Sequence, residues 1–449
     1  MSTAPAVSTR SRKSAPAKLT LLPMIAATYF IVAGGPYGLE DIVHKTGYRA
    51  TLLILIVTPL LWSVPTAMMV SELATSIPEE GGFYIWVRRG LGPFWGYQET
   101  WLSLAGSVFE MAIYPNLFVD YIGQLAPSLV AGHRGLALGF GMIAICTVWN
   151  LVGSRAVGDG SILLNIALLS PFVVLIAFAL FHSHPGIPRA TPLHHADLLG
   201  GILIAMWNYM GWDNMSTVAG EVDNPQRTYS RTMFGALILV IATYLAPVAA
   251  VARTGLDPNA WVTGGWVDVG RVFGGEALAV AITVAAAIGA IGTFGGLMMS
   301  FTRLPSVMAA DGFLPKVFTR ESSRTGTPWV SVIVCAIFWA LCFPLGFEHS
   351  LLLDVLLTGL SILLEFWALA ALRIREPNMP RPYRVPGGLF GAIAIGLPPV
   401  ALMIATVVRN SRELVGDISQ LVIAIAIIAA GAALYYFSLL FRPDARIES

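Results

Sequence analysis

The chain has 449 residues, of which 56% are hydrophobic and 12% charged, and its formal net charge is +1. Soluble domains carry about 25% charged residues, so this composition excludes an ordinary soluble domain and predicts an integral membrane protein. The small net charge gives no indication of a nucleic-acid partner. The 3 cysteines lie in apolar stretches, which indicates buried thiols and no disulfide framework.

Runs of about 20 apolar residues predict twelve membrane-spanning helices. The predicted spans are 19–45, 50–76, 94–124, 134–153, 160–182, 197–219, 229–252, 276–305, 328–346, 349–372, 388–408 and 417–441. Residues 1–18 are basic and rich in Ser, Ala and Pro, which predicts a disordered cytoplasmic tail. Residues 442–449 form a second predicted tail.

The distribution of basic residues predicts the orientation of the chain. When the N-terminus is placed in the cytoplasm, most of the 27 Lys and Arg residues fall in cytoplasmic segments. The sequence therefore predicts a multi-pass protein of the cell (plasma) membrane with both termini in the cytoplasm.

The stretch "AGGPYGLEDIV" (Ala33–Val43) interrupts the first predicted helix with helix-breaking residues. These are Gly34, Gly35, Pro36 and Gly38. Broken helices survive in membranes only where protein or a cavity surrounds the freed backbone groups. The stretch therefore predicts a ligand site, although a simple kink is the alternative.

A second break is predicted in the sixth helix at "WNYMGWDN" (Trp207–Asn214), where Gly211 precedes Trp212 and Asp213. Helices one and six are five apart, which is typical of an inverted repeat of five plus five helices with discontinuous helices in matching positions. The first repeat covers 19–182, the second covers 197–372, and two additional helices occupy 388–441.

Several carboxylates lie inside the predicted spans: Glu40, Asp41, Glu72, Glu110, Asp120, Asp213, Asp354 and Glu365. Each costs about 2.5–3.5 kcal/mol at mid-membrane on insertion scales. No Lys or Arg is predicted near the middle of a span, so protons or a cationic substrate must neutralise them. Glu110 and Tyr114 share a helical face and are predicted to line the site. Because Glu40 and Asp41 are adjacent, only one of them is expected to face the cavity.

Two further features are weaker indicators. The small residues of "GAIGTFGG" (Gly289–Gly296) predict close helix packing or a moving surface beside the site. Four histidines crowd one loop, but their spacing matches no firm ligand pattern, so neither a metal nor another cofactor is predicted. They are His182, His184, His194 and His195.

Taken together, these motifs resemble those of the amino acid–polyamine–organocation superfamily. The motifs are "GGPYGLED", "PEEGGFYIWV", "YPNLFVDY", "GWDNMSTVAGEVDNP", "GFLPKVF" and "LEFWALAALRIREPNMPRPYRVPGG". Within the superfamily, the sequence is most similar to the polyamine uptake branch, which neighbours the L-type amino acid transporters. The resemblance extends from about Thr20 to Gly388.

The resemblance implies an all-α fold of twelve helices, with a 5+5 inverted repeat, alternating access and a substrate site between broken helices one and six. It implies the following substrate-binding residues: Gly34, Gly35, Pro36, Gly38, Glu40, Asp41, Glu110, Tyr114, Trp207, Gly211, Trp212 and Asp213. The walls from helices eight and ten are implied to include Phe294, Gly295 and Glu365. Amino acid transporters of the superfamily often carry Gly-Ser-Gly where this chain has Gly-Gly-Pro. This difference weakens the prediction of an amino acid substrate.

The sequence thus favours a proton-coupled secondary transporter of polyamines or related organic cations, working as a monomer or weak homodimer. The alternative is an amino acid transporter or exchanger, for neutral or cationic amino acids. An enzyme is not predicted, because no nucleophile–base or metal constellation is found. A channel is disfavoured because the two breaks are localised, and no phosphate-binding loop indicates ATP as the driver.

Overall fold

The computed structural model describes residues 18–181, 196–254, 256–345, 347–410, 414–415 and 418–440. Apart from Lys18, both predicted tails lie outside these residues, as do the four clustered histidines. The described residues fold into an all-helical bundle with one two-stranded antiparallel sheet, β1 (Leu414–Val415) with β2 (Ile418–Ser419).

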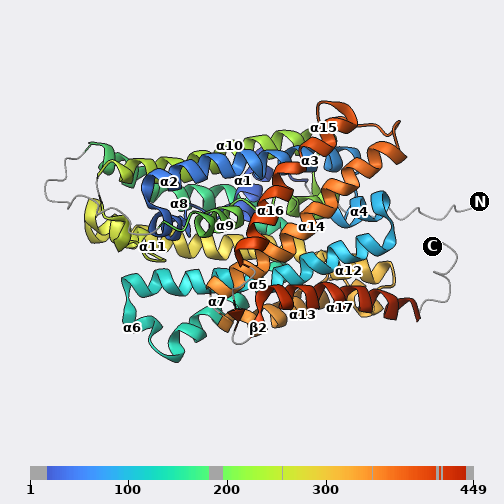
Figure 1. The fold of residues 1–449 in the computed structure, drawn as a ribbon. Helices are drawn as coiled ribbons and strands as arrows, with labels where there is room; N and C mark the ends of the chain where they lie inside the picture. Colours follow the sequence, from blue (N-terminus) through green and yellow to red (C-terminus); the bar gives the residue numbers. More distant parts are fainter. Residues whose placement is uncertain are drawn as a thin grey trace, which may run out of the picture.

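The helices have the following bounds: α1 (Leu21–Val32), α2 (Leu39–Leu61), α3 (Ser63–Ser76), α4 (Phe83–Leu91), α5 (Pro93–Leu125), α6 (Pro127–Val130), α7 (His133–Val152), α8 (Ser154–Phe181), α9 (Leu198–Asn208), η1 (Asn214–Glu221), α10 (Pro225–Ala252), η2 (Pro258–Ala260), α11 (Trp266–Phe301), α12 (Arg303–Ala310), η3 (Lys316–Thr319), α13 (Trp329–Cys342), η4 (Phe343–Leu345), α14 (Phe347–Arg375), α15 (Gly388–Ala394), α16 (Leu397–Asn410) and α17 (Gln420–Leu440). Helices α4 and α15 lie at one end of the bundle and α6 lies at the opposite end (Figure 1).

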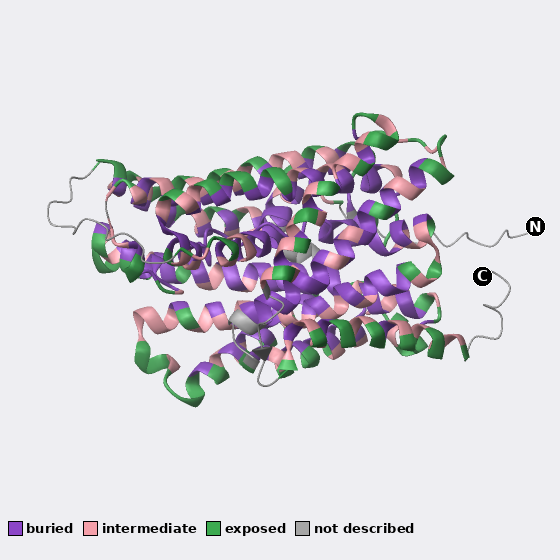
Figure 2. Ribbon diagram, viewed as in Figure 1, coloured by how far each residue is buried: buried purple, intermediate pink, exposed green. Residues whose placement is uncertain are grey.

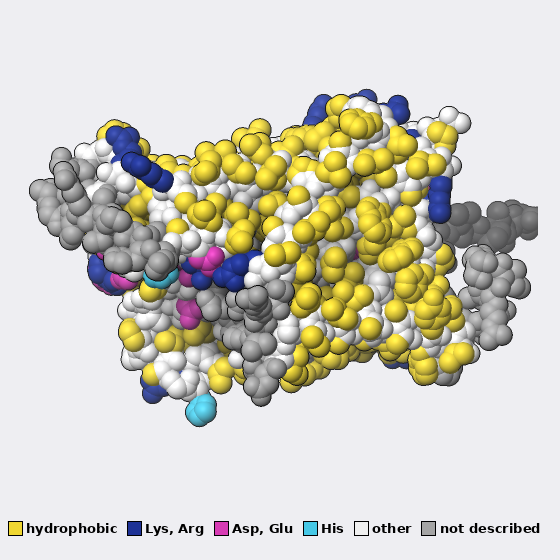
Figure 3. Space-filling model, viewed as in Figure 1, with side chains coloured by type: hydrophobic (Ala, Val, Ile, Leu, Met, Phe, Trp, Pro, Cys, Tyr) yellow, Lys and Arg dark blue, Asp and Glu magenta, His cyan; other side chains and the backbone are white. Residues whose placement is uncertain are grey.

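The surface of the bundle is apolar in the way that lipid requires. Among the described residues, 9 helical segments are long and apolar enough to cross a membrane. Figure 3 shows hydrophobic side chains over most of one flank. On α17, only Gln420, Ala424 and Gly431 are buried, so most of its apolar side chains face outward. The protein is therefore a multi-pass membrane protein.

The interior is built around α5, α11 and α14. Helix α14 packs along α5, and α11 packs against α1, α5 and α8. Buried residues concentrate along these central helices, whereas α17 is largely exposed or half-buried (Figure 2). The central helices therefore have a protein environment in which polar side chains can be held.

The predicted break in the first helix is present. Helix α1 ends at Val32 and α2 begins at Leu39, with a non-helical segment between them. Gly34 has φ +58°, and a Cβ atom there would lie 2.3 Å from Thr293 Oγ1 on α11. Glycine is needed because the left-handed backbone and the close approach to α11 both exclude a side chain.

The predicted break in the sixth helix is also present. Helix α9 ends at Asn208, and the chain turns through Gly211, which has φ +89°, before the 3-10 helix η1 begins at Asn214. The sequence predicted helix over 197–219, but the α-helix covers only the first half. The reason is that Tyr209–Asp213 turns away from the helix axis, and Trp212 Nε1 donates to Tyr209 O at 2.8 Å.

Candidate functional site

A small cavity lies beside the first break. Its volume is about 30 Å³, which is about the space of one water molecule. It is lined by Ala33, Gly34, Tyr37, Tyr114, Leu117, Tyr121, Trp207, Ala286, Gly289, Ala290 and Thr293. Helix α5 contributes side chains three or four residues apart, and α11 contributes small residues that leave space. Any organic substrate therefore requires these walls to move apart.

Two carboxyl groups lie behind tyrosines of this cavity. The Tyr121 hydroxyl donates to Glu40 Oε1, which also accepts from the Gly264 N–H at 2.9 Å. The Tyr114 hydroxyl donates to Glu110 Oε1 at 3.3 Å. Glu40 is 0% exposed and Glu110 is 6% exposed. One aromatic cavity is thus flanked by two buried carboxyl groups from different helices.

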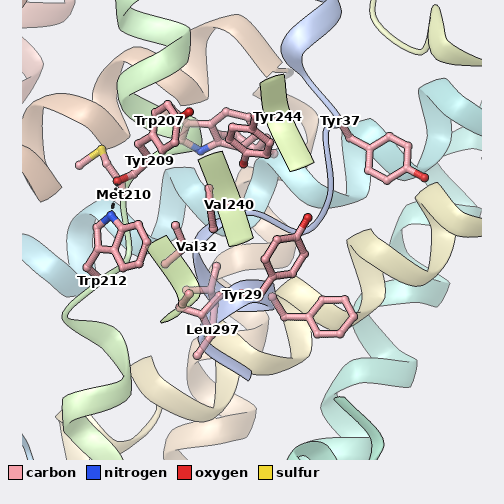
Figure 4. Packing of buried hydrophobic residues seen from close by; sticks show 14 of the residues in the cluster. Tyr29, Val32, Tyr37, Trp207, Tyr209, Met210, Trp212, Val240, Tyr244 and Leu297 are labelled. Carbon is pink, nitrogen blue, oxygen red and sulfur yellow. Dashed lines mark hydrogen bonds between the residues drawn. The ribbon is translucent and has the colours of Figure 1, made fainter. Parts of the chain in front are cut away.

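Aromatic rings form much of the wall. The ring centroids of Tyr37 and Tyr121 are 4.9 Å apart in an edge-to-face arrangement, and those of Tyr114 and Trp207 are 6.2 Å apart. Figure 4 shows Tyr209 and Tyr244, whose ring centroids are 5.2 Å apart, near the broken helices. The Tyr244 hydroxyl lies 3.0 Å from Asn208 O and 3.3 Å from Ala33 O, so it contacts freed carbonyls of both breaks.

Pro36 and Asp41 lie on the side of the first break that faces away from the α4 end of the bundle. Pro36 O accepts from Trp266 Nε1 at 2.8 Å, and the half-buried Asp41 accepts from Thr263 Oγ1 at 2.9 Å. The segment Trp261–Trp266 therefore covers this side. Beyond it lies an open cleft of about 590 Å³, lined by Val119, Asp120, Gly123, Gln124, Val130, Val262 and Thr263.

The other predicted glycines lie at close contacts of the two breaks. A Cβ atom on Gly38 would lie 3.1 Å from the Trp207 ring, and one on Gly35 would lie 2.8 Å from the Tyr37 ring. A Cβ atom on Gly211 would lie 3.2 Å from Ile31 O. Glycine is needed at these positions for packing between the half-helices.

Asp213 and Glu365 lie in a second buried group, away from the cavity lining. Their carboxyl groups interact with each other, and Glu365 also interacts with Glu99 of α5. The sequence prediction did not include Glu99. It stands eleven residues before Glu110, three helical turns away on the same face, so helical spacing could have identified it.

Phe294 and Gly295, which were predicted for the wall, point away from the cavity lining. The Phe294 ring packs on Trp339 of α13 with centroids 5.8 Å apart, and Gly295 O accepts from Asn150 Nδ2 at 3.1 Å. The α11 part of the wall comes instead from Ala286, Gly289, Ala290 and Thr293. The sequence could place α11 at the site but not its rotation about its axis.

The end of the bundle near α4 is closed by ion pairs. Arg88 of α4 and the Tyr84 hydroxyl both bind Asp311, and Arg89 forms two hydrogen bonds to Glu376 at 2.7 and 2.6 Å. The Arg89 hydrogen bonds lower the pKa of the Glu376 carboxyl. These contacts tie α4 to the segments that follow α12 and α14.

Within the described residues, no group of three or more His, Cys, Asp or Glu side chains is arranged to hold a metal ion. The buried polar groups are carboxyls, tyrosines and backbone atoms of two interrupted helices. This combination is characteristic of a membrane transport protein. The chain belongs to the amino acid permease family, whose family model matches residues 24–431.

Individual relatives cover most of the chain. Polyamine transporter PUT1 of Oryza sativa subsp. japonica is 34% identical over 411 residues, covering 91% of this chain and 77% of the relative. Polyamine transporter RMV1 of Arabidopsis thaliana is 34% identical over 393 residues, covering 86% and 79%. The serine/threonine exchanger SteT of Bacillus subtilis (strain 168) is 28% identical over 387 residues, covering 82% and 84%.

Proposed function

We propose that this protein carries polyamines or related organic cations across the cell membrane by alternating access, in a cycle coupled to protons. The observation that carries the proposal is the pair of buried carboxyls, Glu40 and Glu110, behind tyrosines of one aromatic cavity. The names of the plant relatives support a polyamine substrate.

The chemistry of the cavity suits an α,ω-diamine. Such a molecule carries an ammonium group at each end, and each end needs an acceptor. Glu40 and Glu110 supply charge-assisted acceptors, which are worth about 1.5–3 kcal/mol each. The rings of Tyr37, Tyr121 and Trp207 supply faces for cation–π contacts and apolar surface for the methylene chain.

The charge balance of the interior also supports a cationic substrate. Seven carboxyl side chains are buried in the described part of the chain: Glu40, Glu72, Glu99, Glu110, Asp213, Asp354 and Glu365. Among the described residues the only buried basic residue is Arg373, and its guanidinium is bound to Glu72. The remaining carboxyls require protons or substrate ammonium groups for neutralisation.

The fold that we propose has twelve spanning segments in a 5+5 inverted repeat. The three shorter apolar helices α1, α9 and α13 would each complete or form a span beside the longer ones. Helices α1 and α9 are short because each ends at a break, and each begins one proposed repeat, 19–182 or 197–372. Residues 388–441 then contribute two additional helices.

Alternating access would use the two closures described above. On one side Trp266 must release Pro36, and on the other side Arg88 must release Asp311. We assign the α4 end and both termini to the cytoplasm of a plasma-membrane protein that acts as a monomer or weak homodimer. In this scheme Gly34 lines the site with Tyr114 and Trp207, beside the carboxyls of Glu40 and Glu110. The other predicted residues support these groups from behind: Gly35, Pro36, Gly38, Asp41, Gly211, Trp212, Asp213, Phe294, Gly295 and Glu365.

The test is uptake of labelled putrescine, spermidine, arginine and leucine into proteoliposomes with an imposed pH gradient. Glu40→Gln and Glu110→Gln should each weaken putrescine binding about tenfold or more, because each removes one charged acceptor. Glu276→Gln changes an exposed carboxyl on α11 and should leave binding unchanged. Putrescine binding that is indifferent to both cavity variants would reject the assigned site.

A second candidate substrate is an amino acid. The observation in its favour is Gly34, which brings the non-helical backbone of the first break to the cavity wall. Backbone amides at such a break can hold an α-carboxylate. Leucine binding without putrescine binding in the wild type would favour this candidate and reject the polyamine substrate.

A further inference from the structure

Two matching rows of polar side chains face each other where α5 and α14 pack together. On α5 the row is Glu99, Ser103 and Glu110, and on α14 it is Asp354, Thr358, Ser361 and Glu365. Spacings of four, seven and eleven residues place each row on one helical face. We call these residues the α5–α14 polar seam.

Hydrogen bonds connect five of the seven seam residues, from Glu99 through Ser103, Ser361 and Thr358 to Asp354. Ser103 Oγ lies 3.0 Å from Glu99 Oε1 and 3.1 Å from Ser361 Oγ across the helix interface. Ser361 Oγ donates to Thr358 O at 3.2 Å. Thr358 Oγ1 in turn donates to Asp354 Oδ1 at 2.8 Å. Eleven residues of helix cover about 16 Å, so the seam runs about half the thickness of the hydrocarbon core.

Glycine at position 106 permits this close packing. A Cβ atom on Gly106 would lie 2.5 Å from Thr358 Oγ1 and 3.5 Å from Asp354 Oδ1. Any side chain at this position would therefore push the two rows apart. The close approach brings the hydroxyl groups of α14 within reach of α5.

The two ends of the seam have different surroundings. At one end Glu110 accepts from the Tyr114 hydroxyl of the cavity wall, and Asp354 lies one helical turn away beside Gly106. At the other end, toward α4, Glu99 and Glu365 lie within electrostatic range of Asp213 of the second break. The seam therefore leads from the proposed substrate cavity toward the α4 end of the bundle.

At the α4-side end Glu99 accepts from the Ser103 and Thr100 hydroxyls, whereas Glu365 and Asp213 have fewer donors in the described part of the chain. Glu365 is 0% exposed and Asp213 is 3% exposed. Neither oxygen of Glu365 accepts a hydrogen bond from the described part of the chain, and Asp213 Oδ1 also accepts none. Two carboxyl groups held against each other share a proton readily, because the proton supplies the missing donor. The carboxyl groups of Glu99, Asp213 and Glu365 do not line the cavity.

Most basic groups on α14 and on the elements packed against α5 and α14 are already engaged, and the two others on these elements in the described residues, His133 and Arg375, are exposed. The pairings of the engaged groups are Arg88 with Asp311, Arg89 with Glu376, Arg373 with Glu72, Arg271 with Asp268 and Glu276, Arg409 with Asp197, Arg134 with Ser128 O, and Arg303 with Met299 O. Protons are therefore the charge-neutralising species that the seam can accept without rearrangement of these pairs.

We propose that the α5–α14 polar seam carries the coupling proton between the substrate cavity and the Glu99–Asp213–Glu365 group, an inference that rests on the proposed function. In one cycle a proton adds to a carboxylate oxygen at the Glu110–Asp354 end, and a proton leaves a carboxyl at the Glu365 end. The Ser103, Ser361 and Thr358 hydroxyls relay it by exchanging O–H bonds, which requires the Thr358 hydroxyl to turn from Asp354 toward Ser361 and the Glu365 carboxyl to turn toward the seam. No other bond changes. Glu110 then serves both substrate binding and proton entry, whereas Glu99, Asp213 and Glu365 serve only the proton path.

The test measures how many protons enter proteoliposomes for each putrescine molecule, with a pH dye inside and labelled putrescine outside. Glu365→Gln and Ser103→Ala should each lower the proton-to-putrescine ratio about tenfold, because losing a positioned proton-transfer group slows proton transfer by about 10²–10⁴-fold and putrescine then enters without its proton. Ser107→Ala is the matched control. It removes a hydroxyl from the same helix, one that accepts from Trp339 Nε1 outside the seam, and should keep the wild-type ratio.

The outcomes separate the two proposals. A wild-type protein that takes up no putrescine under a pH gradient rejects the proposed function itself. If the wild type couples protons to putrescine uptake and both seam variants keep the wild-type ratio, the proposed proton path is overturned and the proposed function stands. If Glu365→Gln instead weakens putrescine binding about tenfold and leaves the ratio intact, then Glu365 binds an ammonium group and the seam is not the proton path. Ser103→Ala keeps the test decisive if Glu365→Gln fails to fold.

Discussion

Glu72 and Glu376 each hold an arginine through two hydrogen bonds, but in opposite environments. Glu72 of α3 binds Arg373 with side chains 0% and 3% exposed, and Arg381 Nε lies 3.1 Å from it. Glu376 binds Arg89 with side chains 32% and 41% exposed. Removing one partner of a buried pair leaves a desolvated charge, whereas an exposed partner is rehydrated.

We expect Glu72→Gln to lower the free energy of unfolding by about 3–5 kcal/mol, because Arg373 and Arg381 lose the anion that compensates them. The measurement is thermal unfolding in detergent. The matched control Glu376→Gln should change stability by less than about 1 kcal/mol. Equal losses in the two variants would contradict the role of burial.

The cavity tyrosines allow a second comparison at the same scale. Tyr114 donates to the Glu110 carboxyl, whereas Tyr37 donates to the backbone carbonyl of Ile282 at 3.3 Å. We expect Tyr114→Phe to weaken putrescine binding about fivefold to tenfold, because Glu110 loses the donor that orients it. Tyr37→Phe keeps a ring in the same cavity and should have a smaller effect. Stronger binding by Tyr114→Phe would refute the orienting role.

At the scale of the elements, the first break depends on the contact between α1 and α11. Gly34 has a left-handed backbone, and its Cα faces Thr293 Oγ1. We expect Gly34→Ala to abolish putrescine uptake, because the new Cβ separates α1 from α11 and strains φ. The double variant Gly34→Ala with Thr293→Ala should regain only part of the activity, since the backbone strain remains.

The control for that variant is Gly141→Ala on α7. A Cβ atom there meets nothing within 4 Å, and alanine favours the helix by about 1 kcal/mol. Uptake should therefore be unchanged or slightly more heat-resistant. Full activity of Gly34→Ala would show that the break does not need its observed geometry.

The predicted and observed ends of the helices can be compared for α5 and α11. The predicted span 94–124 corresponds closely to α5 (Pro93–Leu125), because a Gly-Pro pair begins the helix and no further glycine–proline cluster interrupts it. The predicted span 276–305 begins ten residues later than α11 (Trp266–Phe301), which continues through a kink at Gly275. Gly275 has φ +66°, so regular helix resumes after it, and the predicted start at 276 coincides with this kink.

At the scale of the whole molecule, the proposed orientation places Arg384 and Ala260 on opposite sides of the membrane. Both are exposed, Arg384 near the α4 end and Ala260 beside the segment that covers the other end. We expect a cysteine at Arg384 to react with a membrane-impermeant maleimide only after the cells are opened. A cysteine at Ala260 should react in intact cells.

The variants for that experiment need a background without the native cysteines Cys146, Cys335 and Cys342, of which the first two are buried. Labelling of Arg384→Cys in intact cells would reverse the assigned orientation. Tags on the two termini of the same variants can be digested from either side of the membrane. The digestion shows whether both termini lie on the same side as Arg384.

The sequence by itself determined the class of the protein, the positions of both breaks and most of the buried carboxylates. These features are local, because a long apolar run, a glycine–proline cluster or a charge within lipid has the same cost in any arrangement. Tertiary structure alone decided which groups meet. Ser103 and Ser361 are 258 residues apart in the chain and Tyr121 is 81 residues from Glu40, so no spacing rule relates them. Helix rotation also placed Phe294 on α13 and Thr293 at the cavity, because adjacent helical residues point about 100° apart and only packing against α1, α5 and α8 fixes the face of α11 that lines the site.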